Sequence, residues 1–111
     1  MASKQDGGCL VVYTRCEPGR DDEFNKWYDE IHVGEVLALP GMTACQRFKL
    51  SDSQMMPDHK FRYMAIYEFD CSPAEALKAM GEGAGGFNMS EDLEAPYMAI
   101  YEPLGDRVLS K

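Results

Sequence analysis

The sequence lacks the patterns that mark several common protein classes. No run approaches the roughly 20 apolar residues of a membrane-spanning helix, so no membrane partner is expected. Cysteine is sparse, and its four copies are scattered without a C-x-x-C pair, which argues against zinc-finger and thioredoxin-like sites. Basic residues are outnumbered, with 11 Lys and Arg against 19 Asp and Glu. The formal charge of −8 disfavours nucleic acid and anionic surfaces as partners.

The first residues of the chain, Met1 to Gly8, contain no apolar core like that of a signal peptide. We therefore expect a flexible tail over residues 1–8 and a single domain over residues 9–111. We also expect a cytoplasmic location, in which the cysteines stay reduced and act mainly as small core residues. A domain of 111 residues buries only part of the surface that its unfolded chain exposes, so association with a second copy would stabilise it.

Segments rich in β-branched and aromatic residues, and segments with helical spacing of apolar residues, divide the chain into six elements. Their order, β-α-β-β-α-β, predicts an α+β ferredoxin-like sandwich with two helices on one face of a four-stranded antiparallel sheet. Gly34 is expected to break the first helix, and a short helical extension over 35–39 is closed by Pro40 and Gly41. The expected strands cover 9–16, 43–50, 61–69 and 95–102, and the expected helices cover 21–33 and 72–80.

One hexapeptide occurs twice, because residues 63–68 and 97–102 both read Tyr-Met-Ala-Ile-Tyr-Glu. In the expected topology the two copies flank the first strand on either side. Within each copy the tyrosines and the alanine share one face and the methionine and isoleucine share the other, so neither face is polar. A sheet with helices on one side should have a wet opposite face. Two apolar faces therefore predict a homodimer packed sheet to sheet.

The first helix carries the leading catalytic candidates. Phe24, Trp27, Tyr28 and Ile31 form an apolar stripe at helical spacing, and His32 falls at the edge of that stripe, one turn from Tyr28. An imidazole at the border between core and solvent exchanges protons near neutral pH, so His32 is a candidate general base or acid with Tyr28 as its partner. The alternative is a structural role in which His32 stabilises the helix end through the helix dipole.

Four short motifs point to one superfamily. They are the Trp27-Tyr28-x-x-x-His32 helix, the Leu39-Pro40-Gly41 turn, Arg47 on the next strand and the repeated Tyr-Met-Ala-Ile-Tyr-Glu strand. Together they resemble the dimeric α+β barrel superfamily, and most closely its EthD-like branch. The resemblance implies two ferredoxin-like subunits whose sheets close into a barrel, each with a small cleft between helices and sheet.

The same resemblance has implications for chemistry. Members of the superfamily include cofactor-free isomerases, polyketide cyclases, decarboxylase-like lyases, quinone-forming monooxygenases and haem-degrading enzymes. In several of these families a histidine from the first helix or the sheet acts with a tyrosine on a small, flat substrate. His32 and Tyr28 match that position, while Gly34 stands where the branch often has a proline.

The strand tyrosines are candidate substrate contacts. Tyr63, Tyr67, Tyr97 and Tyr101 are expected to line a trough for an aromatic ring, with their hydroxyls fixing its polar edge. The alternative is that they pack in the core or in a dimer interface.

Two arginines and a tryptophan complete the candidate binding residues. Arg15 and Arg47 are candidates to hold a substrate carboxylate through a two-pronged hydrogen bond, or else to pair with surface acids. Trp27 is a further candidate to contact the substrate. The glycine-rich stretch over 81–86 follows a helix and has no Lys-Ser/Thr pair, so it is expected to be a flexible connection and not a nucleotide site.

These residues predict a cofactor-independent lyase or isomerase, of decarboxylase, isomerase or cyclase type. It would act on a small aromatic or phenolic acid by proton transfer through His32 and Tyr28. Two alternatives remain open: a non-catalytic dimer that binds a small aromatic ligand, and an EthD-like or quinone-forming monooxygenase. No cofactor and no metal site are expected, because the two histidines lie far apart. Haem bound through His32 is the less supported possibility.

Overall fold

The structure is a computed structural model, and it describes residues 7–111. Residues 1–6 of the expected N-terminal tail lie outside the described residues, and Gly8 is already the first residue of the sheet. The elements are β1 (Gly8–Thr14), α1 (Asp21–Trp27), η1 (Tyr28–His32), α2 (Val33–Leu37), β2 (Met42–Lys49), β3 (Tyr63–Phe69), α3 (Pro73–Gly83), η2 (Ala84–Gly86) and β4 (Tyr97–Tyr101).

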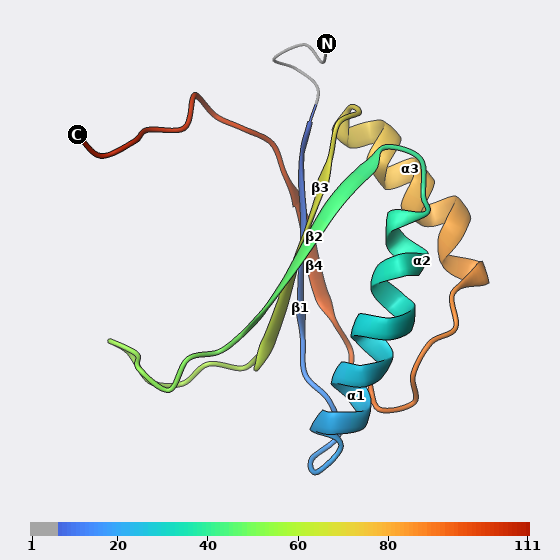
Figure 1. Cartoon of the computed structure of the whole chain (residues 1–111), viewed down its shortest axis with the longest axis vertical. Helices are drawn as coiled ribbons and strands as arrows, with labels where there is room; N and C mark the ends of the chain where they lie inside the picture. The colour runs from blue at the N-terminus through green and yellow to red at the C-terminus, as the bar shows by residue number, and fades with distance from the viewer. Residues whose placement is uncertain (1–6) are drawn as a thin grey trace.

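The four strands form one antiparallel sheet in the order β2-β3-β1-β4. The helices α1, α2 and α3 cover one face of it, as Figure 1 shows edge-on. The predicted α+β ferredoxin-like sandwich is confirmed, and β2 is an edge strand as its alternating residue types predict. Within residues 7–111, no helix is long and apolar enough to cross a membrane.

The first helical segment runs from Asp21 to Leu37 without a break, through α1, η1 and α2. The predicted break at Gly34 is wrong. Gly34 lies inside α2, and its carbonyl accepts the amide of Ala38 at 3.1 Å. The helix instead ends at Leu37 with Ala38 as its C-cap, and the left-handed glycine is Gly41, with a φ of 88°, in the turn that leads to β2.

The second helix begins as its sequence predicts. The Ser72 hydroxyl accepts the amide of Glu75 at 3.1 Å, and the Glu75 carboxylate accepts the amide of Ser72 at 3.3 Å, which together form a capping box. The helix continues to Gly83, beyond the predicted end at residue 80, and residues 84–86 follow as the 3-10 turn η2, so the glycine-rich stretch is helical and the expected flexible connection is wrong. A side chain at Gly83 would collide with Leu39, and its absence lets α3 lie close to the end of α2.

The two hexapeptide copies present opposite faces. Val12 of β1 lies opposite Ala65 of β3 on one side and opposite Met98 of β4 on the other. The copies are therefore out of phase by one residue along β1. Because side chains alternate across a sheet, a difference of one residue turns the same letters to the other face.

The prediction that the four strand tyrosines line one trough is wrong for this reason. Tyr63 and Tyr67 are buried beneath the helices, whereas Tyr97 and Tyr101 on the opposite face are 57% and 55% exposed. The tyrosines of the repeated sequence are therefore core residues in β3 and surface residues in β4.

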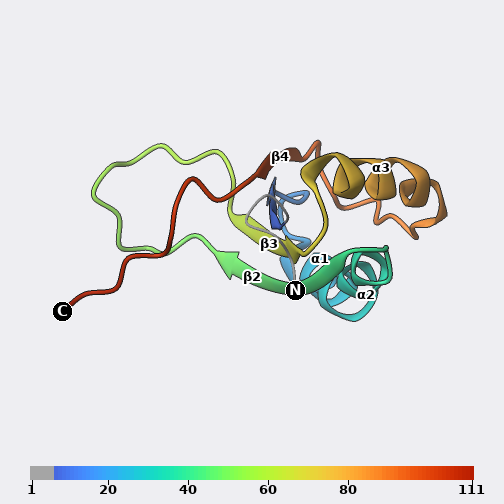
Figure 2. The ribbon, with the colours of Figure 1, turned by 90° about the horizontal axis from the view of Figure 1, so that it is seen from above.

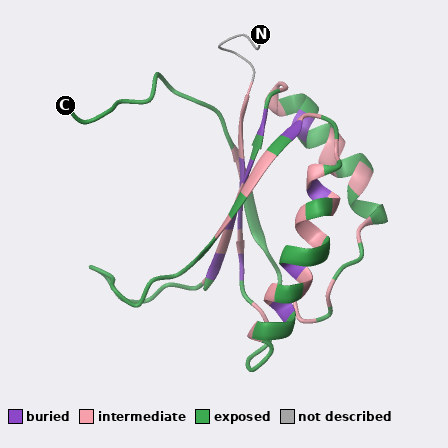
Figure 3. Ribbon diagram, in the orientation of Figure 1, coloured by how far each residue is buried: buried purple, intermediate pink, exposed green. Residues whose placement is uncertain are grey.

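The core lies between the sheet and its helices, where Figure 3 shows the buried segments. Its largest fully buried side chains are Phe24 and Tyr28 from α1 and η1, Val36 from α2, and Tyr67 from β3. Cys16, Cys45 and Cys71 pack against this core, in line with their expected role as small core residues.

The opposite side of the sheet has no helix over it and bears apolar side chains. We call this the open face; it carries Val11, Phe48, Ile66, Tyr97 and Tyr101. Two extended arms, residues 50–62 and 102–111, reach away from the helices on this side (Figures 1 and 2). Exposed apolar side chains on the arms are Leu50, Met55, Met56, Leu104, Val108 and Leu109.

The two glycines provide a matched test of the helix assignment. A Cβ at Gly34 meets nothing within 4 Å, so Gly34→Ala should raise the free energy of unfolding by about 0.5–1 kcal/mol. Gly41→Ala should lower it by about 1–3 kcal/mol, because Gly41 has a positive φ and its Cβ would overlap the Cys71 sulfur. Urea denaturation of both variants measures the difference. A Gly34→Ala variant that loses stability would contradict a continuous helix.

Candidate active site

A cavity of about 290 Å³ lies between the helices and the helix-covered face of the sheet. Its walls are almost entirely apolar, and the polar side chains among them are those of Thr14, Tyr28, His32 and Tyr67. No Arg, Lys, Asp or Glu of the described residues lines it. The remaining lining residues are Leu10, Val12, Val36, Met80, Ala84, Phe87, Met89, Leu93, Pro96 and Met98.

Tyr28 and His32 reach this cavity because the helix widens between them. Residues 28–32 form a π turn, in which the amide of Val33 donates to the carbonyl of Tyr28. A π turn takes one residue more than an α turn, so it shifts the phase of the side chains that follow. His32 is consequently turned inward, with a side chain only 12% exposed, whereas Ile31 from the predicted apolar stripe is 44% exposed.

Aromatic rings fix the His32 imidazole on three sides. The Trp27 ring stacks on it at 4.8 Å between centroids and 19° between planes. Tyr28 and Phe87 meet it edge to face, at 5.0 and 5.4 Å. The predicted Trp27–Tyr28–His32 grouping is thus brought together in space, and the imidazole has little rotational freedom.

One nitrogen of the imidazole faces a carboxylate. His32 Nδ1 lies 3.5 Å from Glu35 Oε1, and both side chains are largely buried. This distance is longer than an ordinary hydrogen bond of about 2.7–3.2 Å. Neither buried atom has a hydrogen-bond partner elsewhere in residues 7–111, so each is the group best placed to satisfy the other. Nε2 is then the ring nitrogen left for a ligand in the cavity.

The Glu35 carboxylate is itself held by Asn88, a residue distant from it in the sequence. Its Oε2 accepts the backbone amide of Asn88 at 2.6 Å and the Asn88 side-chain amide at 3.1 Å. Trp27 Nε1 donates to the Asn88 carbonyl at 2.7 Å. Sequence reasoning missed both Glu35 and Asn88. The three-residue spacing of His32 and Glu35 could have revealed Glu35, but Asn88 lies 53 residues further on and had no local signal.

The environment keeps His32 neutral at neutral pH. Burial lowers its pKa below the ordinary 6.5, Glu35 partly opposes that effect, and the Arg47 guanidinium adds to it. An unprotonated imidazole in an apolar cavity can accept a proton, which is the state that a general base requires.

The two buried tyrosines form a hydrogen-bonded pair. The Tyr67 hydroxyl donates to the Tyr28 hydroxyl at 3.2 Å. Burial raises the pKa of both phenols, and for Tyr67 the neighbouring Tyr28 hydroxyl raises it further. Both groups therefore stay protonated at neutral pH. Because Tyr67 donates its only O–H proton to Tyr28, the Tyr28 hydroxyl is the one that can donate a hydrogen bond to a ligand oxygen, and neither phenol is suited to remove protons.

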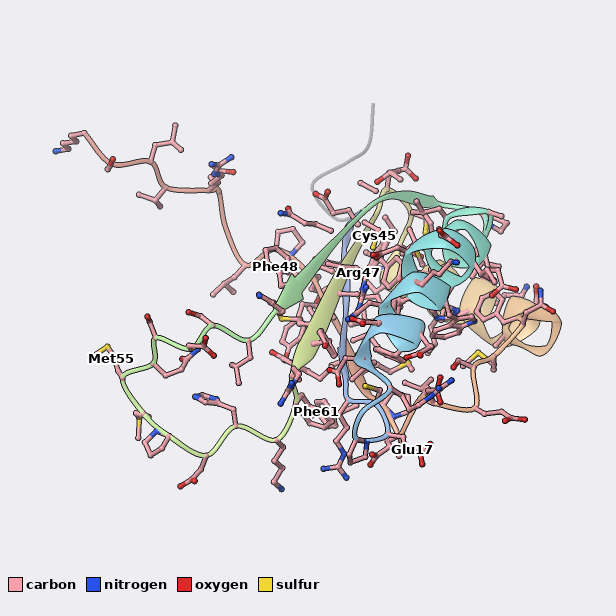
Figure 4. The ribbon with its side chains drawn as sticks, turned by 60° about the horizontal axis from the view of Figure 1, so that its bottom comes forward. Glu17, Cys45, Arg47, Phe48, Met55 and Phe61 are labelled. Carbon is pink, nitrogen blue, oxygen red and sulfur yellow. The ribbon has the colours of Figure 1, made fainter. Side chains whose placement is uncertain are left out.

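The predicted arginines lie outside the cavity. The Arg47 guanidinium stacks over the Tyr28 ring, with its carbon 4.2 Å from the ring centroid, and donates to Asp29 at 2.9 Å and to Asn25 at 2.8 Å. Figure 4 shows Arg47 on the helix side of β2 and Phe48 on the other. Arg15 pairs with Glu94 at 3.2 Å on the outer surface. Neither arginine is placed to hold a carboxylate beside His32.

The strand tyrosines divide between three places. Tyr67 lines the cavity with Tyr28. Tyr63 lies in the same core, but its hydroxyl donates to Asp21 at 2.5 Å, away from His32. Tyr97 and Tyr101 lie on the open face.

Comparisons with known proteins place the fold. A scan of protein-family models and a search of curated proteins find no match. Among solved structures, the chain is similar to a DABB family protein with a ferredoxin-like fold from Mesorhizobium loti, with a TM-score of 0.64 and 16% identity over 91% of this chain and 100% of that one. An EthD-like protein from Ralstonia eutropha gives a TM-score of 0.64 and 19% identity over 93% and 96% of the two chains.

A third similar structure is a variant of SnoaB, a cofactor-independent oxygenase from Streptomyces nogalater. Its TM-score is 0.63, with 12% identity over 91% of this chain and 96% of that one. At such identities these likenesses show the fold alone. The chain thus has the ferredoxin-like fold that its predicted resemblance to DABB and EthD-like proteins implies.

Haem, which is bound by MhuD, a haem-degrading protein of similar fold from Mycobacterium tuberculosis, does not fit the residues present. The cavity of about 290 Å³ is at the lower end of the sizes usual for small-molecule sites and is too small for a porphyrin. The described lining residues include no cation to pair with the haem carboxylates. No step below passes through haem.

The lowered pKa of His32 can be measured directly. With His59→Gln to remove the only other imidazole, we expect NMR titration of ¹⁵N-labelled protein to give a midpoint below 6.5, because burial disfavours the imidazolium. Folding is then opposed by protonation: its stability is complete above pH 6.5 and falls as the pH drops through the folded-state pKa. A midpoint at or above 6.5 would show that the imidazole is not buried as described.

Proposed function

We propose that this chain is a cofactor-independent enzyme that transfers a proton on a small, uncharged hydroxyaromatic compound or ring ketone. The observation that carries the proposal is a neutral histidine, held by Glu35 and aromatic rings, at the wall of an apolar cavity beside two tyrosine hydroxyls. Apolar walls with a few converging polar groups are typical of small-molecule sites.

In this mechanism His32 Nε2 removes a proton from a phenolic hydroxyl or from a carbon next to a carbonyl. The negative charge moves to the ring or enolate oxygen, where the Tyr28 hydroxyl donates a hydrogen bond and Tyr67 supports it from behind. Return of the proton from His32 to another atom completes an isomerisation or cyclisation. The tyrosines act on the charge that develops in the reaction, which is the form of stabilisation most effective in a dry site.

The absence of charged side chains among the described lining residues narrows the expected substrate. A carboxylate in this cavity would be taken out of water without a cation to compensate it, which is strongly unfavourable. We therefore favour isomerase or cyclase chemistry on an uncharged ring over decarboxylation of an aromatic acid.

Oxygenation is the second candidate, and the fold similarity to SnoaB, a cofactor-independent oxygenase, favours it. The first step is the same, because a deprotonated hydroxyaromatic ring is the electron-rich form that reacts with oxygen. An oxygen electrode separates the two reactions: uptake with a dihydroxynaphthalene that depends on His32 supports oxygenation. A chain that merely binds an aromatic ligand would show neither reaction.

Proton transfer can be tested without the natural substrate. β-Tetralone, an uncharged two-ring ketone, should exchange its α-protons in D₂O in the presence of the enzyme, as followed by ¹H NMR. His32→Gln should slow the catalysed exchange by about 10²- to 10⁴-fold, because it removes the base.

Two inhibitors that differ in charge test whether the cavity excludes a carboxylate. β-Naphthol should inhibit the exchange, whereas β-naphthoate at the same concentration should not, since no cation receives its carboxylate. Equal exchange by the wild-type protein and His32→Gln would exclude His32 as the base, and stronger inhibition by β-naphthoate would exclude an uncharged substrate.

We also propose that the open face packs against the open face of a second copy. Phe48, Tyr97 and Tyr101 are exposed there. The two arms project on the same side of the sheet (Figure 1), and they also carry exposed apolar side chains. A second copy seated on the sheet would place its own surface between these arms. The exposed apolar area would then be removed from water, at about 25 cal/mol per Å².

Light scattering after size exclusion tests this assembly. The wild-type protein should elute as a dimer, and Phe48→Glu should shift it to a monomer because a carboxylate would be buried without a partner. Leu77→Glu is the matched control, since Leu77 is exposed on α3, on the other side of the molecule, and its substitution should leave the dimer intact. A monomeric wild-type protein would refute the proposal.

A further inference from the structure

The segment between α3 and β4 covers the cavity and contacts the catalytic helix. Phe87, Met89, Leu93 and Pro96 of this covering segment, residues 84–96, line the cavity. One end is held at the helix through Asn88, and the other is held where Leu93 forms a β-bridge with Cys16. The covering segment therefore closes the space in which the proposed reaction takes place.

We propose that Glu35 is a positioning residue that fixes the proton of neutral His32 on Nδ1, and that Asn88 holds Glu35 only while the covering segment is closed. The inference rests on the proposed function in one respect, which is that Nε2 of His32 is the working base. It assigns roles to two residues that do not line the cavity.

The tautomer follows from the chemistry of the carboxylate. An ionised carboxylate accepts hydrogen bonds and donates none, so the ring nitrogen that faces it must carry the proton. Since His32 Nδ1 faces Glu35 Oε1, the lone pair of the neutral ring is on Nε2. The other titratable or charged groups near the ring are Tyr28 on the same helix, Tyr67 on β3 and Arg47 on β2; the phenols stay protonated and Arg47 is cationic, so none of them competes as an acceptor for Nδ1.

The orientation of the carboxylate follows from Asn88. Two donors of Asn88 occupy Oε2 and leave Oε1 to face the imidazole. The Asn88 carbonyl in turn accepts from Trp27, whose ring stacks on His32. One residue of the covering segment thus fixes both the carboxylate and the aromatic ring that hold the base.

Closure and positioning are linked as a result. When the covering segment lifts to admit a ligand, Glu35 loses both donors, Trp27 loses its acceptor and Phe87 leaves the imidazole edge. When it closes, all of these contacts are restored together. The base therefore acquires its correct tautomer in the same movement that excludes water from the ligand.

The Glu35→Gln variant tests the positioning role with a readout that needs no turnover. Its side-chain carbonyl can still accept from Asn88, which leaves its NH₂ group facing His32 Nδ1. We expect ¹⁵N NMR in the His59→Gln background to show the Nδ1–H tautomer in the parent protein and the Nε2–H tautomer in Glu35→Gln, with a lower pKa for His32. Glu30→Gln, at an exposed position of the same helix, should change neither. An unchanged tautomer in Glu35→Gln would overturn the inference.

Amide hydrogen exchange tests the link to the covering segment. Glu35→Ala removes the acceptor of the Asn88 amide, and Trp27→Phe keeps a stacking ring but removes the donor to the Asn88 carbonyl. Both should speed exchange at Asn88 by about tenfold or more, and Glu30→Gln should not. Unchanged exchange in both variants would refute the link.

The outcomes also separate this inference from the proposed function. A reversed tautomer in Glu35→Gln together with tetralone exchange that does not depend on His32 would preserve the positioning role and reject the enzyme. Exchange that depends on His32 but is unaffected in Glu35→Gln would preserve the enzyme and reject the positioning role.

Discussion

The alternation of side chains across β1 is the constraint on which the site depends. Val12 has Ala65 on one side and Met98 on the other, so the two identical hexapeptides must turn opposite faces to the helices. Tyr67 is thereby placed beneath the helices, while Tyr101 is placed on the open face. If β4 were shifted by one residue, a second pair of tyrosines would replace Met98 and Ile100 under the covering segment, and the cavity would be polar.

The π turn at 28–32 is the second constraint, because it decides which side chains of the helix point toward the sheet. A regular α-helix without the π turn would point Ile31 toward the core and leave His32 at the border between core and solvent. The extra residue in the turn reverses this order and sets His32 against Tyr28 and Trp27. Since the helix then continues through Gly34, Glu35 follows one turn later on the same side. A helix broken at Gly34 would have separated the imidazole from its carboxylate.

Much of the fold could be predicted because its signals are local. The capping box at Ser72, the alternation in β2 and the order of elements each follow from residues close together in the sequence. The site could be predicted only in part. Tyr28 and His32 share a helix turn, so their proximity was evident. Which face of the sheet each tyrosine occupies depends on strand register, and two identical hexapeptide sequences give no information about register. Asn88 contacts Glu35 only through the tertiary fold.

Charge distribution explains why the arginines were misleading candidates for substrate binding. Arg47 lies on the same face of the sheet as the core tyrosines, but each of its two terminal nitrogens already donates to the helix, one to Asp29 and the other to Asn25. Its remaining influence on the site is electrostatic, because its charge together with burial favours neutral His32. A cavity without charged side chains selects a ligand by its shape and by its hydroxyl or carbonyl groups. In the proposed reaction, the charge in the cavity then develops only when the proton is transferred.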